Sequence, residues 1–262
     1  MLVDVHCHLT FNDFKKDLNR VIEKARNAGM VAILCSGVDH DTNVEVLELS
    51  EKYKILKASL GIYPLDAVGL GHYDGVHRQA KKMDVDAEIK FIRQNREKII
   101  AVGEVGLDKS PEGDCRMEEQ KEVFKKTIRL AEEIKKPLVV HTRKAEKECL
   151  DILEEMKAKN VVLHCFMGNM KLVERAEKLG YFFSIPSIIV RLKHFQEVVS
   201  RVSLNNLFTE TDAPYLSHVR GERSEPINVK ETIKKIAEIK KIEESEVEKI
   251  IFSNYQKVFL KE

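Results

Sequence analysis

The chain has 262 residues, of which 43% are hydrophobic and 33% are charged, so it is long enough for one α/β barrel or two modest domains with a full core. The net charge of +1 excludes a protein held to polyanions by bulk electrostatics, so any contact with nucleic acid must be local. The five cysteines form no CxxC pair, which predicts reduced thiols in a cytoplasmic protein. No apolar run approaches the ~20 residues of a membrane span, so none is expected.

Short β-branched runs alternate with amphipathic stretches along the whole chain. The runs that we expect to be strands are 2–5, 31–35, 55–60, 99–102, 138–140, 161–163, 181–183 and 206–208. Helical spacing is clearest over 117–135 and 145–157, and Gly29 and Gly180 stand where helices should end. Eight strands separated by helical stretches predict a single (β/α)8 TIM barrel over residues 1–262. The rival, a doubly wound open sheet, usually has a glycine fingerprint after its first strand, and here His-Cys-His follows instead.

Residues 68–82 carry three glycines and little periodicity. We expect them to form a long loop after a strand, near the functional site. No signal peptide is expected, because the first candidate motif already begins at residue 4.

Histidines and carboxylates stand at the ends of the predicted strands. His6 and His8 are two apart at the end of the first strand, so their side chains should point the same way and share a metal ion. Glu104 ends the fourth strand, where a carboxylate is costly to bury without a cation. His141, His164 and Asp212 follow the fifth, sixth and eighth strands. In a barrel these ends share the rim on which active sites are built.

Four histidines and two carboxylates suit Zn²⁺, Mn²⁺, Co²⁺ or Mg²⁺. Six ligands exceed the needs of one tetrahedral ion, so two ions that share a carboxylate, roughly 3.5–4 Å apart, fit the set better. Cys7 and Cys165 flank the candidate ligands but fall out of phase with them, which indicates packing roles.

The order of these motifs resembles the TatD family of metal-dependent deoxyribonucleases, which are amidohydrolase-like barrels. The matching residues, in chain order, are Asp4-x-His6-x-His8-Leu9, Gly103-Glu104-Val105-Gly106-Leu107-Asp108, His141-Thr142-Arg143, His164-Cys165-Phe166-x-Gly168 and Glu210-Thr211-Asp212-Ala213-Pro214-Tyr215. The resemblance covers nearly the whole chain.

The resemblance implies a hydrolase that cleaves phosphodiester bonds in DNA, often as a 3′→5′ exonuclease, with single strands or 3′ ends as substrate. It implies that one ion, Mg²⁺, Mn²⁺ or Zn²⁺, is held by His6, His8, Glu104 and Asp212, and that a second is held by Glu104, His141 and His164, with Glu104 bridging. Asp212 would also take the proton from the attacking water. Glu210 would contact a further ion or a water, or be an ordinary strand residue.

The loops that should face the substrate match the family less well. Many relatives have Gly-Ile-His-Pro where this chain has Gly61-Ile62-Tyr63-Pro64, and Arg-Asn-Glu-Pro where it has Arg223-Ser224-Glu225-Pro226. Candidate substrate contacts are Arg143, Arg220 and Arg223 as phosphate forks, Lys109 and Lys144 as point charges, and Phe11, Tyr63 and Phe166 as stacking faces. The alternative is an ordinary solvated surface charge for each of the five cations and a core position for each of the three aromatic rings.

Two other classes of function remain open from the sequence. The same activated water would serve a D-aminoacyl-tRNA deacylase or another ester or amide hydrolase. A metal-bound nucleic-acid-binding module without turnover is the other alternative, although a pure binder has no use for an open two-metal site.

Overall fold

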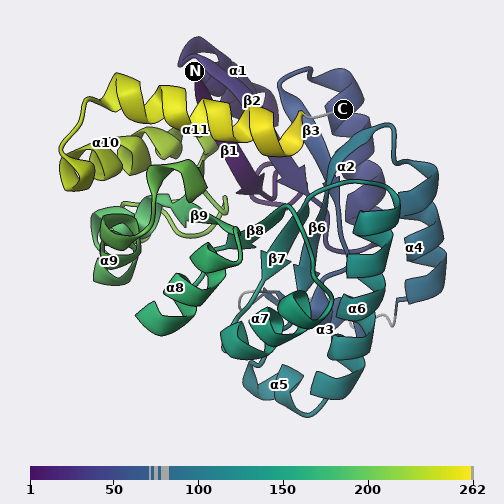
Figure 1. The fold of residues 1–262 in the computed structure, drawn as a ribbon. Coiled ribbons are helices and arrows are strands. Elements are labelled where there is room, and N and C mark those ends of the chain that lie inside the picture. Colours follow the sequence, from purple (N-terminus) through teal and green to yellow (C-terminus); the bar gives the residue numbers. More distant parts are fainter. Residues whose placement is uncertain (71, 74–75, 78–82, 261–262) are drawn as a thin grey trace.

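Eight parallel strands form one sheet in the order β1-β2-β3-β6-β7-β8-β9-β10 in the computed structural model, which describes residues 1–70, 72–73, 76–77 and 83–260 (Figure 1). Their bounds are β1 Leu2–Cys7, β2 Met30–Ser36, β3 Leu56–Leu60, β6 Ile99–Gly106, β7 Leu138–His141, β8 Val161–His164, β9 Phe182–Pro186 and β10 Leu207–Glu210. A separate antiparallel pair joins β4 His72–Tyr73 and β5 Val76–His77.

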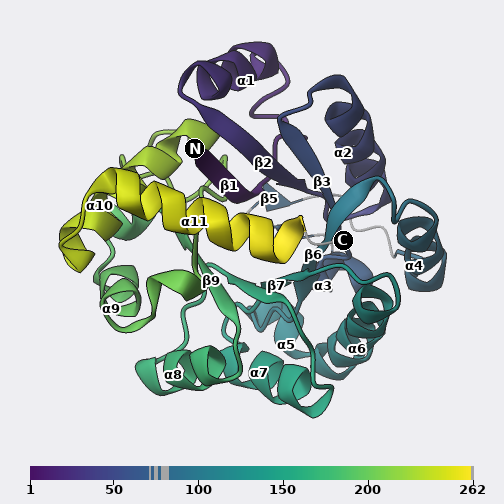
Figure 2. The same cartoon turned by 45° about the horizontal axis from the view of Figure 1, so that its top comes forward.

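The two outer strands of this order meet and close the sheet. The Asp212 N–H donates to the His6 carbonyl at 2.9 Å, and the His8 N–H donates to the Ala213 carbonyl at 2.8 Å. Because these bonds join the segment after β10 to the end of β1, the sheet becomes the predicted (β/α)8 barrel (Figure 2).

Helices surround the strands on the outside of the barrel (Figure 2). The α-helices are α1 Leu18–Asn27, α2 His40–Lys52, α3 Pro64–Ala67, α4 Val85–Gln94, α5 Pro111–Asp114, α6 Met117–Glu133, α7 Glu146–Glu155, α8 Met170–Lys178, α9 Lys193–Arg201, α10 Val229–Lys240 and α11 Glu244–Phe259. Short 3₁₀ turns are η1 Ser187–Val190, η2 Leu204–Asn206 and η3 Pro226–Asn228. Within the described ranges, no helix is long and apolar enough to cross a bilayer.

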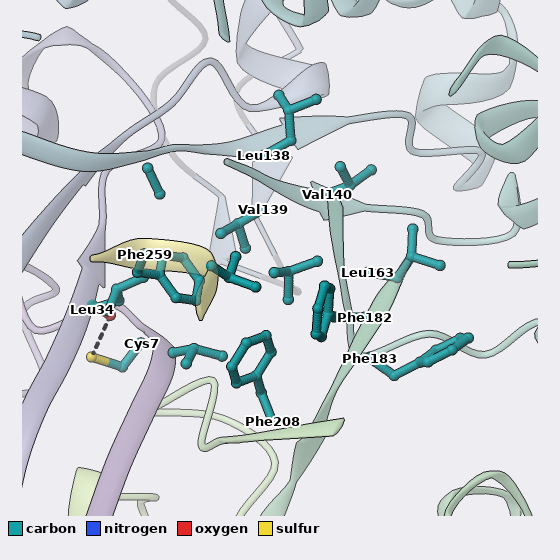
Figure 3. Close-up of a cluster of buried hydrophobic side chains, with 14 of the residues drawn as sticks. Cys7, Leu34, Leu138, Val139, Val140, Leu163, Phe182, Phe183, Phe208 and Phe259 are labelled. Carbon is teal, nitrogen blue, oxygen red and sulfur yellow. Dashed lines mark hydrogen bonds between the residues drawn. The ribbon is translucent and has the colours of Figure 1, made fainter. Parts of the chain in front are cut away.

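Helix α11 lies across the end of the barrel where β1 begins. The N-terminal amine pairs with Glu248 of this helix at 2.8 Å. Phe259 packs on Phe208 with ring centroids 5.5 Å apart, and Phe208 packs on Phe182 at 5.2 Å. Together with buried residues of β7 and β8 these rings form the core shown in Figure 3. Since apolar side chains close this end, polar chemistry is left to the opposite rim.

Most predicted boundaries hold within a few residues. The helix expected over 117–135 ends at Glu133, and Gly29 and Gly180 follow helices with φ of +84° and +79°. The fourth barrel strand differs, because β6 continues to Gly106 and so contains Glu104. The expected loop over 68–82 falls largely outside the described residues, which include only its first three positions and the strands β4 and β5.

Candidate metal centre

His6 and His8 face the same point at the end of β1. Their Nε2 atoms are 3.1 Å apart, and both side chains are fully buried. Nδ1 of His8 lies 3.0 Å from the Ser36 carbonyl, which can only accept a hydrogen bond. This contact fixes the proton on Nδ1, so Nε2 of His8 presents its lone pair to the interior of the site.

Glu104 lies between two pairs of histidines. Its Oε2 is 3.5 Å from Nε2 of His6 and 3.4 Å from Nε2 of His8. Its Oε1 is 2.8 Å from Nδ1 of His141 and 3.9 Å from Nε2 of His164. The two oxygens of one carboxylate therefore face different imidazole pairs, which is the arrangement that a bridging ligand needs.

Asp212 follows β10 and points back toward β1. Its Oδ1 lies 3.5 Å from Nε2 of His6. The backbone has φ of +51°, a region that aspartate tolerates better than most residues. Buried Asp4 holds this turn by accepting hydrogen bonds from the Thr211 N–H at 3.0 Å and the Thr211 hydroxyl at 2.6 Å. Burial raises the pKa of Asp4 to about 8.

A carboxylate lies behind each of the two remaining histidines. Nε2 of His141 is 3.0 Å from Oδ2 of Asp108, on the ring edge opposite Glu104. Nδ1 of His164 is 2.9 Å from Oε2 of Glu210, which also accepts from the Ser184 hydroxyl. The proton of each imidazole can thus point to the outer carboxylate, while its other nitrogen faces the site.

Imidazoles and carboxylates set one another's charge in this site. Burial alone would raise the pKa of Glu104, but hydrogen bonds from His141 and His6 hold it well below its usual range. Burial alone would lower the pKa of His141, but Asp108 and Glu104 raise it to about 10. A cation that enters the site therefore meets ionised carboxylates and displaces protons from histidines.

The residues present fit divalent cations. Three buried groups each bring ligand atoms within 4.8 Å of one another, and they are His6/His8/Glu104, His6/His164/Asp212 and Glu104/His141/His164. Oδ1 of Asp212 is buried and, among the described residues, has no hydrogen-bond partner. Such an atom is costly to bury unless a cation satisfies it. All six candidate ligands predicted from the sequence thus lie together.

Comparison with known proteins identifies the family. Residues 3–260 match the family described as TatD related DNase. The chain belongs to the TatD family. It is a TatD-type metal-dependent hydrolase, as the resemblance of its motifs predicted.

Relatives match along almost their entire length. The chain is 35% identical over 265 residues to human deoxyribonuclease TATDN3, covering 99% of this chain and 95% of the relative. It is 35% identical to an uncharacterized metal-dependent hydrolase of Methanocaldococcus jannaschii, covering 98% and 96%. The crystal structure of the TatD homologue YjjV of Escherichia coli superposes with a TM-score of 0.85 at 24% identity, covering 100% and 98%, which confirms the fold.

A cavity of about 280 Å³ opens beside the TatD site. Its walls include His141, His164 and Asp212 of the candidate centre, together with Arg143, Lys144 and Glu146. Arg143 is partly exposed, and its Nε lies 3.7 Å from Asp108. The position of Arg143 and Lys144 suits an anionic group bound next to the metal centre. Phe11 stacks on His8 at 4.9 Å, meets the ring of Tyr215 edge-on at 6.3 Å, and is partly exposed.

The stacking roles expected for Tyr63 and Phe166 do not fit the structure. Both rings are buried, with exposures of 0% and 1%, so neither offers a face to a base. Phe166 packs on Phe183 in the core. Tyr63 instead donates its hydroxyl to Asp108 at 2.8 Å.

The expected phosphate fork of Arg223 is also corrected. Its guanidinium donates to Asp17 at 2.8 and 2.9 Å and to Glu225 at 2.9 Å, and it lies over the ring of Phe14 at 4.6 Å. Lys109 similarly pairs with Glu148 at 3.2 Å. Arg220 is exposed in the segment after β10.

Sequence reasoning missed the residues behind the histidines. In the sequence Asp108 stands out only as part of a motif, and no pattern links Glu210 to His164. One signal is present in the sequence, because Asp108 and Glu210 directly follow the mostly apolar runs 105–107 and 207–209. A buried carboxylate there requires a donor, and an imidazole is a suitable one.

Proposed function

We propose that residues 1–262 act as one hydrolase domain that cleaves phosphodiester bonds in DNA with two divalent ions, Mg²⁺, Mn²⁺ or Zn²⁺. Single-stranded DNA and 3′ ends are the proposed substrates, and 3′→5′ is the proposed direction. The observation that carries the proposal is the position of Glu104, whose two oxygens face separate imidazole pairs at 2.8–3.9 Å.

Two further observations support this function. The cavity beside the centre is lined by Arg143 and Lys144 as well as by Glu146, and the two cations suit a phosphate more than a neutral amide. A relative that is 35% identical over 99% of the chain is named a deoxyribonuclease. The net charge of +1 agrees with recognition of DNA at a local site.

The proposed ligands are His6, His8, Glu104 and Asp212 for one ion, and Glu104, His141 and His164 for the other. When bound, such ions neutralise the phosphodiester charge, lower the pKa of water and stabilise the leaving oxygen. Asp212 accepts the proton of the attacking water. Burial alone would raise the pKa of Asp212, but nearby His164 and His6 lower it, so the carboxylate stays ionised. Arg143 orients the phosphate from the wall of the cavity.

The experiment is hydrolysis of single-stranded DNA labelled at its 3′ or 5′ end. Metal-stripped protein is supplied with Mg²⁺, Mn²⁺ or Zn²⁺ in turn. Asp212→Ala is the inactive variant, and Asp86→Ala is its matched control, because Asp86 is 78% exposed on α4, where it pairs with Lys126. We expect metal-dependent removal of nucleotides from the 3′ end by the wild type and by Asp86→Ala.

Other outcomes discriminate the alternatives. Cleavage that also occurs in Asp212→Ala would indicate a contaminating nuclease. Folded, metal-loaded protein without cleavage of DNA would contradict the proposal. Release of amino acid from D-aminoacyl-tRNA in that case would assign the same centre to ester hydrolysis, and metal binding without turnover of any ester would assign a binding module.

A further inference from the structure

The two halves of the centre have different surroundings. The groups behind His6 and His8 are neutral, since Nδ1 of His6 is 3.2 Å from the Ser36 hydroxyl and Nδ1 of His8 is 3.0 Å from the Ser36 carbonyl. The groups behind His141 and His164 are the carboxylates of Asp108 and Glu210, at 3.0 and 2.9 Å. The anionic support is therefore confined to one half.

The carboxylates among the candidate ligands are also distributed unevenly. Oδ1 of Asp212 lies 3.5 and 3.4 Å from Nε2 of His6 and His8, and Asp212 also shares a ligand group with His164. His141 falls in one group, in which Glu104 is the carboxylate. Asp108 therefore adds a negative charge behind the imidazole that has the fewest carboxylates in front of it.

Asp108 is held in place from several sides. Its Oδ1 accepts the Ser110 N–H at 2.8 Å, and its Oδ2 accepts the Tyr63 hydroxyl at 2.8 Å. The side chain of Gln120, buried on α6, accepts from the Asp108 N–H at 2.8 Å and donates to the Asp108 carbonyl at 3.0 Å. A carboxylate fixed in this way fixes the ring of His141 in turn.

We infer that Asp108, supported by Tyr63, and Glu210 are positioning residues that set the affinity of one ion, the one held by His141 and His164. Each orients an imidazole, fixes its proton on the outer nitrogen and increases the basicity of the inner nitrogen. The inference rests on the two-ion centre of the proposed function. In this inference the buried Tyr63 holds Asp108 in place through its hydroxyl.

The experiment titrates Mn²⁺ alone into metal-stripped protein, with bound ions counted by equilibrium dialysis and paired ions detected by their exchange-coupled electron paramagnetic resonance signal. The variants are Asp108→Asn, Glu210→Gln and Tyr63→Phe. Glu133→Gln is the control, since Glu133 at the end of α6 pairs with Arg93 at 2.7 Å, away from the centre. Circular dichroism and Tm establish that each variant is folded.

We expect two ions in the wild type and in Glu133→Gln. Asp108→Asn and Glu210→Gln should bind one of the two about 10–100-fold more weakly, the range typical for removal of a group behind a histidine ligand, and should lose the coupled signal at subsaturating Mn²⁺. Tyr63→Phe should show a smaller loss in the same ion, because Asp108 keeps its bond to the Ser110 N–H.

A wild type that binds two ions, together with folded variants that bind both as tightly, would overturn this inference alone. A wild type that binds a single ion would overturn it together with the two-ion centre. Should Asp108→Asn fail to fold, Glu210→Gln and Tyr63→Phe decide the question by the same two measurements.

Discussion

A Cβ atom on Gly61 would lie 2.1 Å from the backbone nitrogen of Glu104. Glycine at the end of β3 is therefore what allows the neighbouring strand to bring Glu104 to the middle of the centre. Asn43 fixes this close approach, because its side chain donates to the Gly61 carbonyl at 2.7 Å and accepts the Gly61 N–H at 3.0 Å.

Gly61→Ala should displace Glu104, because the atoms that the new methyl group meets are backbone. We expect a loss of about 1–3 kcal/mol or more in the free energy of unfolding by urea, as overpacking typically costs, and loss of both Mn²⁺ ions. Gly29→Ala is the control, with φ of +84° but no atom within 4 Å, so it should cost only about 1 kcal/mol of backbone strain. Equal metal binding in both variants would contradict this account.

Asp212→Ala should reduce the rate of hydrolysis by at least about 10²–10⁴-fold, the range for loss of a general base. The fold should remain, since the side chain belongs to the site and not to the hydrophobic core. Steady-state rates and far-ultraviolet circular dichroism measure the two effects. Loss of the folded state in this variant would show that Asp212 holds the barrel closed as well.

Arg143→Gln and Arg223→Gln should have different effects on the KM for DNA. Arg143 lines the cavity, so its loss should raise KM for DNA by about 10-fold or more, as expected for a hydrogen bond to a charged group. Arg223 is engaged with Asp17 and Glu225, so its loss should leave KM within about 2-fold. Kinetics over a range of DNA concentrations test both, and the opposite order would return Arg223 to the substrate site.

Binding of single-stranded DNA should depend only weakly on salt. About three basic residues of the rim, Arg143, Lys144 and Arg220, can reach phosphates. A logarithmic slope of about −2 follows from about 0.7 released ions per contact. Fluorescence anisotropy with the Asp212→Ala variant measures it. A slope equivalent to eight or more ions would reveal a basic surface elsewhere.

The cluster of Arg223, Asp17 and Glu225 predicts a dependence of stability on acid. Hydrogen bonds from Arg223 and Arg20 lower the pKa of Asp17, and Lys24 and Arg223 lower the pKa of Glu225 against the effect of burial. Depressed carboxyl pKa values stabilise the fold above the ordinary range near pH 4, and this contribution is lost as pH falls through the folded-state values. Between about pH 6 and pH 3, the free energy of unfolding by urea should therefore fall less in Arg223→Gln than in the wild type. An equal fall of the unfolding free energy with pH in both proteins would show that these ion pairs have no role in acid stability.

The sequence predicts the barrel, and it predicts that the six candidate ligands meet at one rim, because both depend on periodicity. His6 and Asp212 stand at strand ends, and a parallel barrel brings all such ends to one rim. The orientation of the loop side chains that were expected to contact the substrate follows no such rule. Whether Arg223 faces DNA or Asp17, and whether Tyr63 shows its ring or buries it, depends on packing between loops that strand patterns do not specify.

Glu210 illustrates the same limit. Alternation along β10 places its side chain inside the barrel, yet only the structure shows that His164 meets it there. Contacts of this kind join residues far apart in the chain, and a single sequence has no local signal for them.

The barrel is closed by hydrogen bonds between the end of β1 and the segment after β10. Synthesis by the ribosome proceeds from the first of these to the second, so the imidazoles of His6 and His8 emerge long before the carboxylate of Asp212. A nascent chain that lacks the last strand has only part of the proposed ligand set and lacks the proposed general base. If Asp212 has the proposed role, hydrolytic competence is acquired late in translation, and a chain interrupted before residue 212 is released without it.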